Sequence, residues 1–272
     1  MRAWPVVFAL LCACASPEEA ASAPVERFGF VPRPFRADVL LMVDGSSDMR
    51  VPQERLVAAL PGFVERLVEA ELELHVGVVT ADMGAGGADI PTCRGSGMSD
   101  DGQLRTRGDR RWPGCAANYA PFLAYDGRRD VDAFATDLGC VARVGTDGCE
   151  LEQPLEAILK ALSPAAPTFW TADGYEAPQF ALGAVGHGDG VNDLFRQPDA
   201  ILVIVHLSTE DDCSVRDLSF FRDAPPSDVR CVEGSEALHP ISRYVDGFVA
   251  LGRETARIFY VPIVGIPEDL EP

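Results

Sequence analysis

Four runs of apolar residues stand out along the chain, each about as long as a buried β-strand. Continuous runs of this kind are typical of strands covered on both faces, since a strand with one wet face alternates apolar and polar residues. The runs are Ala37–Val43, Leu74–Val79, Ala200–Val205 and Ile258–Val264. The pattern therefore predicts a sheet with protein on both sides of it.

Between these runs, apolar residues recur at helical spacing. Pro52 suits the first turn of the first predicted helix, Pro61 is expected to bend it, and Ser163–Pro164 ends the second helix. The apolar positions of the three helices are, in turn, Leu56, Leu60, Phe63, Val64, Leu67 and Val68; Leu155, Ile158, Leu159 and Leu162; and Ile241, Tyr244, Val245, Phe248, Val249 and Leu251. Strands that alternate with helices predict an α/β fold, with a doubly wound, mostly parallel sheet and helices on both faces.

Residues 36–272 suit a single domain with long loops. Regular patterns are weak at about 81–129 and at about 164–199, where Gly is frequent together with Asp, Arg or Pro. Loops of this length in a compact domain are usually functional or poorly ordered.

The N-terminal region has the features of an export signal. Arg2 supplies a positive charge, and a short apolar run leads to Leu11-Cys12-Ala13-Cys14, which resembles a lipobox. We expect residues 1–13 to be a lipoprotein signal peptide and Cys14 to be lipidated, because Ala13 is small; a signal peptide without lipid is the alternative. Residues 14–35 are expected to form a flexible tether.

The resemblance to lipoproteins also implies a location. Ala15 and Ser16 follow Cys14, which points to the outer membrane of a bacterium, with the domain facing the periplasm or the cell surface. No later stretch reaches the ~20 apolar residues of a transmembrane helix, so the lipid anchor is the expected membrane contact.

Acidic residues dominate the chain, with 42 Asp and Glu against 23 Lys and Arg and a formal net charge of −19. Lys160 is the only lysine. A surface of this charge repels nucleic acid and anionic headgroups, so neither is an expected partner.

Six cysteines follow the lipidation site, and an even number in an exported chain predicts disulfides. They are Cys93, Cys115, Cys140, Cys149, Cys213 and Cys231. The sequence leaves all the pairings open, and the simplest is between neighbours: Cys93–Cys115, Cys140–Cys149 and Cys213–Cys231. Zinc is disfavoured because no Cys-x₂-Cys spacing or nearby His occurs.

A polar loop follows the first predicted strand, where ligands bind in parallel α/β sheets. The segment Val43-Asp44-Gly45-Ser46-Ser47-Asp48-Met49 resembles the Asp-x-Ser-x-Ser loop of von Willebrand factor type A (vWA) domains. The resemblance implies a metal-ion-dependent adhesion site for Mg²⁺ or Mn²⁺, built from short oxygen ligands. An ordinary strand-to-helix turn, with Ser47 or Asp48 as N-cap, is the alternative.

Further segments strengthen the resemblance and extend it over roughly Ala37 to Pro267. They are Gly77–Met83, Gly145–Ala157 with its Glu-Gln-Pro-Leu-Glu-Ala stretch, and Ser208-Thr209-Glu210-Asp211-Asp212-Cys213-Ser214. Together they resemble a subgroup of bacterial surface lipoproteins with vWA-like, Rossmann-like domains. Members carry Ser-Asp-Glu-Asp-Asp-Cys-Ser and Glu-Gln-x-Leu-Glu-Ala at these places.

The chain also departs from this family pattern. Asp48 stands where Ser is usual, and Thr209 stands where the family places Asp. Thr146 is the nearest counterpart of the Thr in the second metal loop, but its register differs. If Asp44 and Asp48 both bind, they neutralise a divalent ion, and an additional carboxylate would give a closed, calcium-like cage. The candidate ligands of Mg²⁺, Mn²⁺ or Ca²⁺ are therefore Asp44, Ser46, Asp48, Thr209, Glu210 and Asp211.

These features predict a binding protein rather than an enzyme. The chain lacks a Gly-x-Ser-x-Gly elbow, a phosphate loop and metalloprotease histidine spacing, and His75 and His206 are expected to be hydrogen-bonded residues of buried strands. The expected role is adhesion to a protein or surface glycan, with unknown oligomeric state. The alternatives are a metal-free structural scaffold, and a metal-dependent hydrolase that uses the acidic run Glu210–Asp212, which otherwise caps the next helix.

Overall fold

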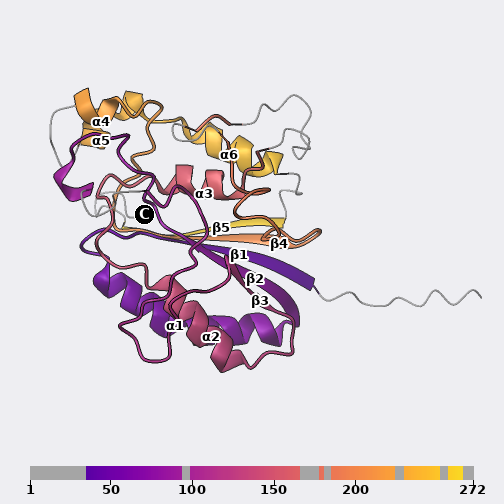
Figure 1. The fold of residues 1–272 in the computed structure, drawn as a ribbon. Coiled ribbons are helices and arrows are strands. Elements are labelled where there is room, and N and C mark those ends of the chain that lie inside the picture. The colour runs from indigo at the N-terminus through magenta and orange to yellow at the C-terminus, as the bar shows by residue number, and fades with distance from the viewer. Residues whose placement is uncertain are drawn as a thin grey trace, which may run out of the picture. The chain divides into compact units, whose positions relative to one another are not determined.

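A five-stranded mixed sheet forms the centre of the domain (Figure 1). The computed structural model describes residues 35–93, 99–165, 178–180, 185–223, 230–251 and 257–265. The predicted leader, Cys14, the tether up to residue 34 and part of the predicted 164–199 loop lie outside these residues. The strands are β1 (Phe35–Val43), β2 (Leu72–Val79), β3 (Phe122–Tyr125), β4 (Ile201–Leu207) and β5 (Ile258–Ile263).

The strand order is β3-β2-β1-β4-β5. The pairings β1–β2, β1–β4 and β4–β5 are parallel, whereas β3 runs antiparallel to β2. β2 and β3 lie on one side of β1, and β4 and β5 lie on the other. The strand order therefore switches sides between β1 and β4, and ligands bind at such a switch point in open α/β sheets.

Helices cover both faces of this sheet (Figure 1). The longer ones are α1 (Arg50–Glu69), α2 (Val131–Ala142), α3 (Pro154–Leu162) and α6 (Ile241–Ala250). Short helical segments are η1 (Pro91–Cys93), α4 (Phe220–Asp223), α5 (Arg230–Glu233) and η3 (Ser235–Ala237). Within the described ranges, no helix combines the length and the apolar composition needed to cross a membrane.

Alternate residues of β1 face two separate apolar layers, because successive side chains of a strand point to opposite faces. Val39 and Leu41 pack in the layer beneath α1 and α2, and Leu40 and Met42 pack in the layer beneath α3 and α6. All four side chains are at most 1% exposed. The expectation that the first apolar run is a strand covered on both faces is confirmed.

The four predicted strands and three predicted helices are all present, with ends that move by a few residues. Apart from the short helical segments η1, α4, α5 and η3, two elements were not predicted. β3 lies inside the stretch taken as the loop 81–129, and α2 follows it directly. β3 has only four residues, which is too short for a clear periodic signal. The sequence does carry a signal for α2, since Asp130 accepts a hydrogen bond from Ala133 N and caps the helix.

Three disulfides fasten the loops, and they correct two of the expected pairings. The bonds are Cys93–Cys149, Cys115–Cys140 and Cys213–Cys231. Only the last is a neighbour pair. Neighbour pairing fails because Cys140 lies within α2, whereas Cys149 packs with Cys213 in a third apolar cluster.

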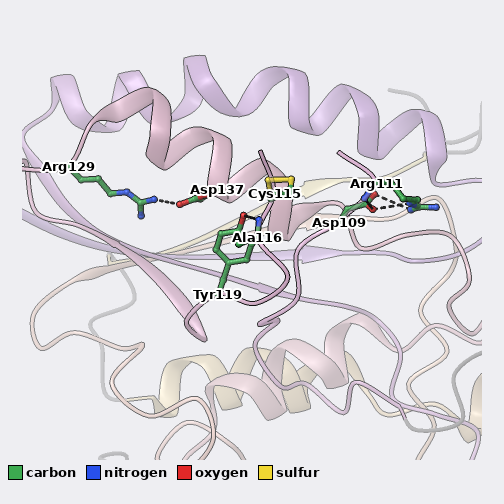
Figure 2. The surroundings of a disulfide bond; sticks show 8 residues. Asp109, Arg111, Cys115, Ala116, Tyr119, Arg129 and Asp137 are labelled. Carbon is green, nitrogen blue, oxygen red and sulfur yellow. Dashed lines mark hydrogen bonds and ion pairs between the residues drawn. A yellow bond between two sulfur atoms is a disulfide. The ribbon is translucent and has the colours of Figure 1, made fainter. Parts of the chain in front are cut away.

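The Cys115–Cys140 bond holds an exposed excursion of the chain against α2 (Figure 2). Around it, Asp109 forms an ion pair with Arg111 at 2.9 Å, and the hydroxyl of Tyr119 accepts a hydrogen bond from Ala116 N at 2.8 Å. The disulfide thus adds to other contacts of this segment with α2 and its end, since Asp109 N donates to Cys140 O at 3.1 Å and Arg143 lies over the Trp112 ring.

Candidate functional site

The candidate site begins where two neighbouring parallel strands end. Val43 of β1 pairs with Leu207 of β4, and Asp44 N donates a hydrogen bond to Leu207 O at 3.0 Å. Asp44 and Ser208 therefore meet at the carboxyl edge of the sheet, at the point where the strand order reverses. The topology brings the first polar loop and the loop after β4 together, as the sequence predicts.

Asp44 is the buried centre of this arrangement, with a side chain that is 0% exposed. Its Oδ1 accepts a hydrogen bond from Ser46 N at 2.7 Å. Its Oδ2 accepts from Ser208 Oγ at 2.8 Å and from Thr209 N at 3.4 Å. These donors fix the orientation of the carboxylate.

Asp48 lies at the exposed side of the site and joins the two loops. Its Oδ1 accepts hydrogen bonds from Ser46 Oγ at 3.0 Å and from Thr209 Oγ1 at 2.9 Å. The N-cap of α1 is Met49, without a side-chain capping bond. Ser47 and Asp48, the N-caps expected if the segment is an ordinary strand-to-helix turn, therefore do not cap this helix.

Glu210 and Asp211 are both exposed and have fewer contacts with the Asp44 site than Asp48 and Thr209 have. Partial burial raises the pKa of Glu210, and the charges of Asp48 and Asp44 add to the effect. In the described part of the chain, no hydrogen bond joins Asp211 to Asp44 or Asp48. The structure thus gathers Asp44, Ser46, Asp48 and Thr209 directly, and leaves Asp211 aside.

Glu152, which was not among the predicted site residues, is buried beside Asp44. It is 2% exposed, and its Oε2 has no hydrogen-bond partner among the described residues. Burial raises the pKa of Glu152 to about 12, and the adjacent Asp44 carboxylate contributes. The carboxyl therefore keeps its proton at neutral pH unless a cation is present to balance a second buried negative charge.

A clamp holds the loop that carries Glu152 against the Asp44 turn. The Gln53 amide nitrogen donates to Asp44 O at 2.9 Å and to Gly145 O at 2.7 Å. Gly148 N donates to Gly45 O at 2.9 Å. A Cβ on Gly148 would lie 2.8 Å from that same oxygen, so this close approach requires glycine.

The end of the acidic run stabilises a helix rather than the site. Asp212 Oδ1 accepts hydrogen bonds from Leu155 N at 3.2 Å and from Ser214 Oγ at 2.8 Å. Burial raises the pKa of Asp212 to about 6, although these hydrogen bonds oppose the shift. The run was expected to cap the helix that follows it, but Asp212 caps α3, which precedes it in sequence.

Glu156, one turn after Glu152, faces away from the site. Its carboxylate accepts two hydrogen bonds from the Arg243 guanidinium, at 3.1 and 2.8 Å. Of the two glutamates in the Glu-Gln-Pro-Leu-Glu-Ala stretch, only Glu152 is available to the Asp44 cluster.

The two strand histidines have structural partners, as predicted. His75 Nδ1 lies 2.9 Å from Phe195 O, and His206 Nδ1 lies 2.5 Å from the Tyr260 hydroxyl. Burial lowers the pKa of His206 to about 4, so this side chain is neutral at physiological pH.

The donor set restricts how a metal could bind. Among the described residues, no three His, Cys, Asp or Glu side chains form a cluster able to hold an ion by themselves. A cation at this edge would need the hydroxyls of Ser46, Ser208 or Thr209 in addition to carboxylates. Oxygen-only ligands of this type suit Mg²⁺, Mn²⁺ or Ca²⁺.

Comparisons with known proteins leave the family open. No protein-family model matches the chain, and no curated protein matches it in sequence. The structure itself defines the class: an α/β domain with a mostly parallel five-stranded sheet and disulfide-bonded loops.

The buried Glu152 leads to a prediction about pH. Its folded pKa is raised above the unfolded value of about 4.3, so the folded state binds more protons than the unfolded state. In EDTA, the contribution of this group to stability is therefore present at acidic pH and is lost as the pH rises above ~4.3. We expect Glu152→Gln to remove this loss and to raise the free energy of unfolding at pH 8 by about 1–3 kcal/mol.

Urea denaturation of both proteins from pH 5 to pH 8 measures this difference. Subtracting one pH profile from the other removes the contributions of His206 and the other titrating groups. The prediction would be contradicted if the free energy of unfolding of Glu152→Gln fell with pH as steeply as that of the parent. A Glu152→Gln protein that is less stable than the parent at every pH would also contradict it.

Proposed function

We propose that this protein is an envelope lipoprotein whose vWA-like domain binds a protein or glycan partner through a divalent cation at the carboxyl edge of the sheet. Asp44, Ser46 and Asp48 would hold the cation, with Thr209 and Glu152 completing the set. The observation that carries the proposal is the buried, unpartnered Oε2 of Glu152 beside the Asp44 carboxylate. Ionising this carboxyl beside the buried Asp44 carboxylate is costly, and a cation would balance the second negative charge.

The topology supports a doubly wound, vWA-type domain. The order β3-β2-β1-β4-β5 follows the first five strands of the 3-2-1-4-5-6 arrangement of doubly wound sheets. Asp44 and Ser208 follow the two strands at its switch point. Export, lipidation at Cys14 and the outer-membrane location remain proposals that rest on the N-terminal sequence.

The chemistry at the site combines a buried and an exposed half. Asp44 and Glu152 lie inside, whereas Asp48 and Thr209 are exposed and can be reached by a partner. A divalent cation would supply an electrophilic centre for a carboxylate or hydroxyl oxygen of that partner. Because Asp44 and Asp48 both carry negative charge, we expect the centre to be weakly electrophilic and the site to prefer Ca²⁺.

Thermal unfolding of the mature chain in Mg²⁺, Mn²⁺ or Ca²⁺ against EDTA tests the proposal. An ion at a hundredfold excess over its Kd stabilises the native state by about 2.7 kcal/mol, which raises the midpoint by several degrees. We expect this shift to be lost in Asp44→Asn and in Glu152→Gln. Asp211→Asn is the matched control, because it removes an exposed carboxylate that makes no contact with Asp44, and it should retain the shift.

The absence of any shift in the parent protein would overturn the cation-binding proposal. It would favour the second candidate, a metal-free scaffold of an envelope assembly. One observation supports that candidate: the carboxylates of Asp44 and Asp48 already accept hydrogen bonds from Ser46, Ser208 and Thr209.

A further inference from the structure

Exposed apolar side chains are concentrated on α6 and at β5. Eight of the fifteen large apolar side chains that are exposed in the described residues lie there. They are Ile241, Val245 and Val249 of α6, and Phe259, Tyr260, Val261, Ile263 and Val264 in or next to β5. Ile241, Val245, Val249, Tyr260 and Val264 line one groove, whereas Phe259, Val261 and Ile263 alternate with Tyr260 along β5 and so face the other side of the sheet. An exposed apolar patch such as the first marks an interaction site.

Between α6 and β5 lies a groove of about 560 Å³, which we call the α6–β5 groove. Its rim includes Ile241, Val245 and Val249 on one side, and Tyr260 and Val264 on the other. Its floor includes Phe248 of the core, which is 8% exposed. The groove is thus an opening onto the apolar layer beneath α6.

The α6 helix has two apolar faces, and the core accounts for only one of them. Tyr244 and Phe248 are buried against the sheet. Ile241, Val245 and Val249 recur at i, i+4 and i+8, so they form a second stripe; Ile241 is 66% and Val245 55% exposed. An apolar stripe that faces solvent is explained by a partner.

The edge of β5 disfavours addition of another strand. Ser208 N donates to Ile263 O from the β4 side. Backbone groups of successive residues in a strand point to opposite sides, so the backbone of Pro262 faces the open edge, where proline offers no N–H. A partner strand would lose a ladder hydrogen bond there. Recognition through side chains in the groove does not meet this obstacle.

The size of the apolar patch indicates which partner fits the groove better, a single helix or a second copy of the chain. The exposed apolar surface of the groove comes from five side chains, whereas a standard interface takes ~800 Å² and about 20–30 residues per partner. The net charge of −19 also opposes self-association. An amphipathic helix with apolar anchors at i, i+4 and i+7 matches both the area and the groove.

The charge around the groove indicates which polar residues a partner helix would carry. Asp246 is exposed on α6 between Val245 and Val249, and the chain carries a formal net charge of −19. We propose that the α6–β5 groove docks an amphipathic helix of a partner protein, with its apolar stripe in the groove and basic residues flanking that stripe.

A synthetic, fluorescein-labelled helix of about 18 residues, or five turns, is the probe. It carries Leu along one face and Lys or Arg elsewhere, and its binding to the full chain in EDTA is followed by fluorescence anisotropy. We expect saturable binding that Val245→Asp weakens at least tenfold and Asp246→Arg weakens severalfold. Val191→Asp is the matched control, because Val191 is 54% exposed outside the groove, and it should bind like the parent.

Several outcomes would overturn the inference. They are no binding at 100 µM peptide, equal binding of a scrambled peptide whose leucines share no face, and insensitivity to Val245→Asp. Self-association that Val245→Asp abolishes would identify a second copy as the occupant, and Val245-dependent binding to anionic phosphatidylglycerol vesicles would identify a lipid surface. Asp44→Asn should leave peptide binding unchanged, so the groove and the proposed cation site succeed or fail separately.

Discussion

Replacing Lys160 with methionine is expected to lower the free energy of unfolding by about 3–5 kcal/mol, because it breaks a buried ion pair from one side. Lys160 is 0% exposed, and its Nζ donates to Asp101 Oδ1 at 2.6 Å. The same carboxylate is 3.1 Å from His187 Nε2. Methionine fills similar volume but leaves Asp101 with its main counter-charge gone. Equilibrium denaturation in urea measures the loss.

The double variant Lys160→Met, Asp101→Asn is the control. It removes both charges, so it should recover most of the stability lost in the single variant. Asparagine also tolerates the left-handed backbone of Asp101, whose φ is 53°. Equal losses in the single and double variants would show that Lys160 acts through packing alone.

The stability contributed by the Lys160–Asp101 ion pair is expected to depend on pH. Burial would raise the pKa of Asp101, but hydrogen bonds and charges from His187 and Lys160 outweigh it and lower the pKa. The stabilisation is therefore present at neutral pH and is lost as the pH falls below about 4. The difference in stability between the parent and the double variant should shrink on acidification.

Removing the Cys93–Cys149 bond, by changing both residues to alanine, is expected to cost about 4 kcal/mol. The two cysteines are 56 residues apart, and a cross-link over a longer loop removes more entropy from the unfolded chain. The Cys213–Cys231 bond spans only 18 residues, so its removal should cost about 3 kcal/mol. Urea denaturation of the two paired variants under non-reducing conditions compares them directly.

Peptide mapping of the unreduced protein provides the control for this comparison. Digestion should release one cross-linked fragment with Cys93 and Cys149 and another with Cys115 and Cys140. Fragments that join Cys93 to Cys115 would contradict the structure, and the predicted order of stabilities would then have no basis.

The elements that could be predicted from sequence are those with long apolar patterns. The first strand and the helix through Leu60 and Val64 are examples, since both bury several residues at regular spacing. β3 could not be predicted, because a strand of four residues at the sheet edge has too few positions to establish a period. The disulfide pairing could not be predicted because it depends on which loops meet over the sheet.

The candidate site could be predicted where it depends on strand order. Asp44 and Thr209 meet because β1 and β4 are neighbours, and adjacent parallel strands end at one edge. Glu152 was missed because its burial comes from the Gln53 clamp and the close approach of Gly148 to Gly45, and neither contact has a sequence period. Asp211 was included because acidic runs do not reveal which members face inward.

Pro262 also has a consequence for how the chain behaves when many copies are crowded together. An unpaired apolar edge strand is a template for intermolecular sheets and fibrils. Pro262 leaves the open edge of β5 without one of its N–H donors. The strand at the opposite edge, β3, has only four residues. Both edges of the sheet, as the described residues form it, are therefore poor templates for polymerisation through the backbone.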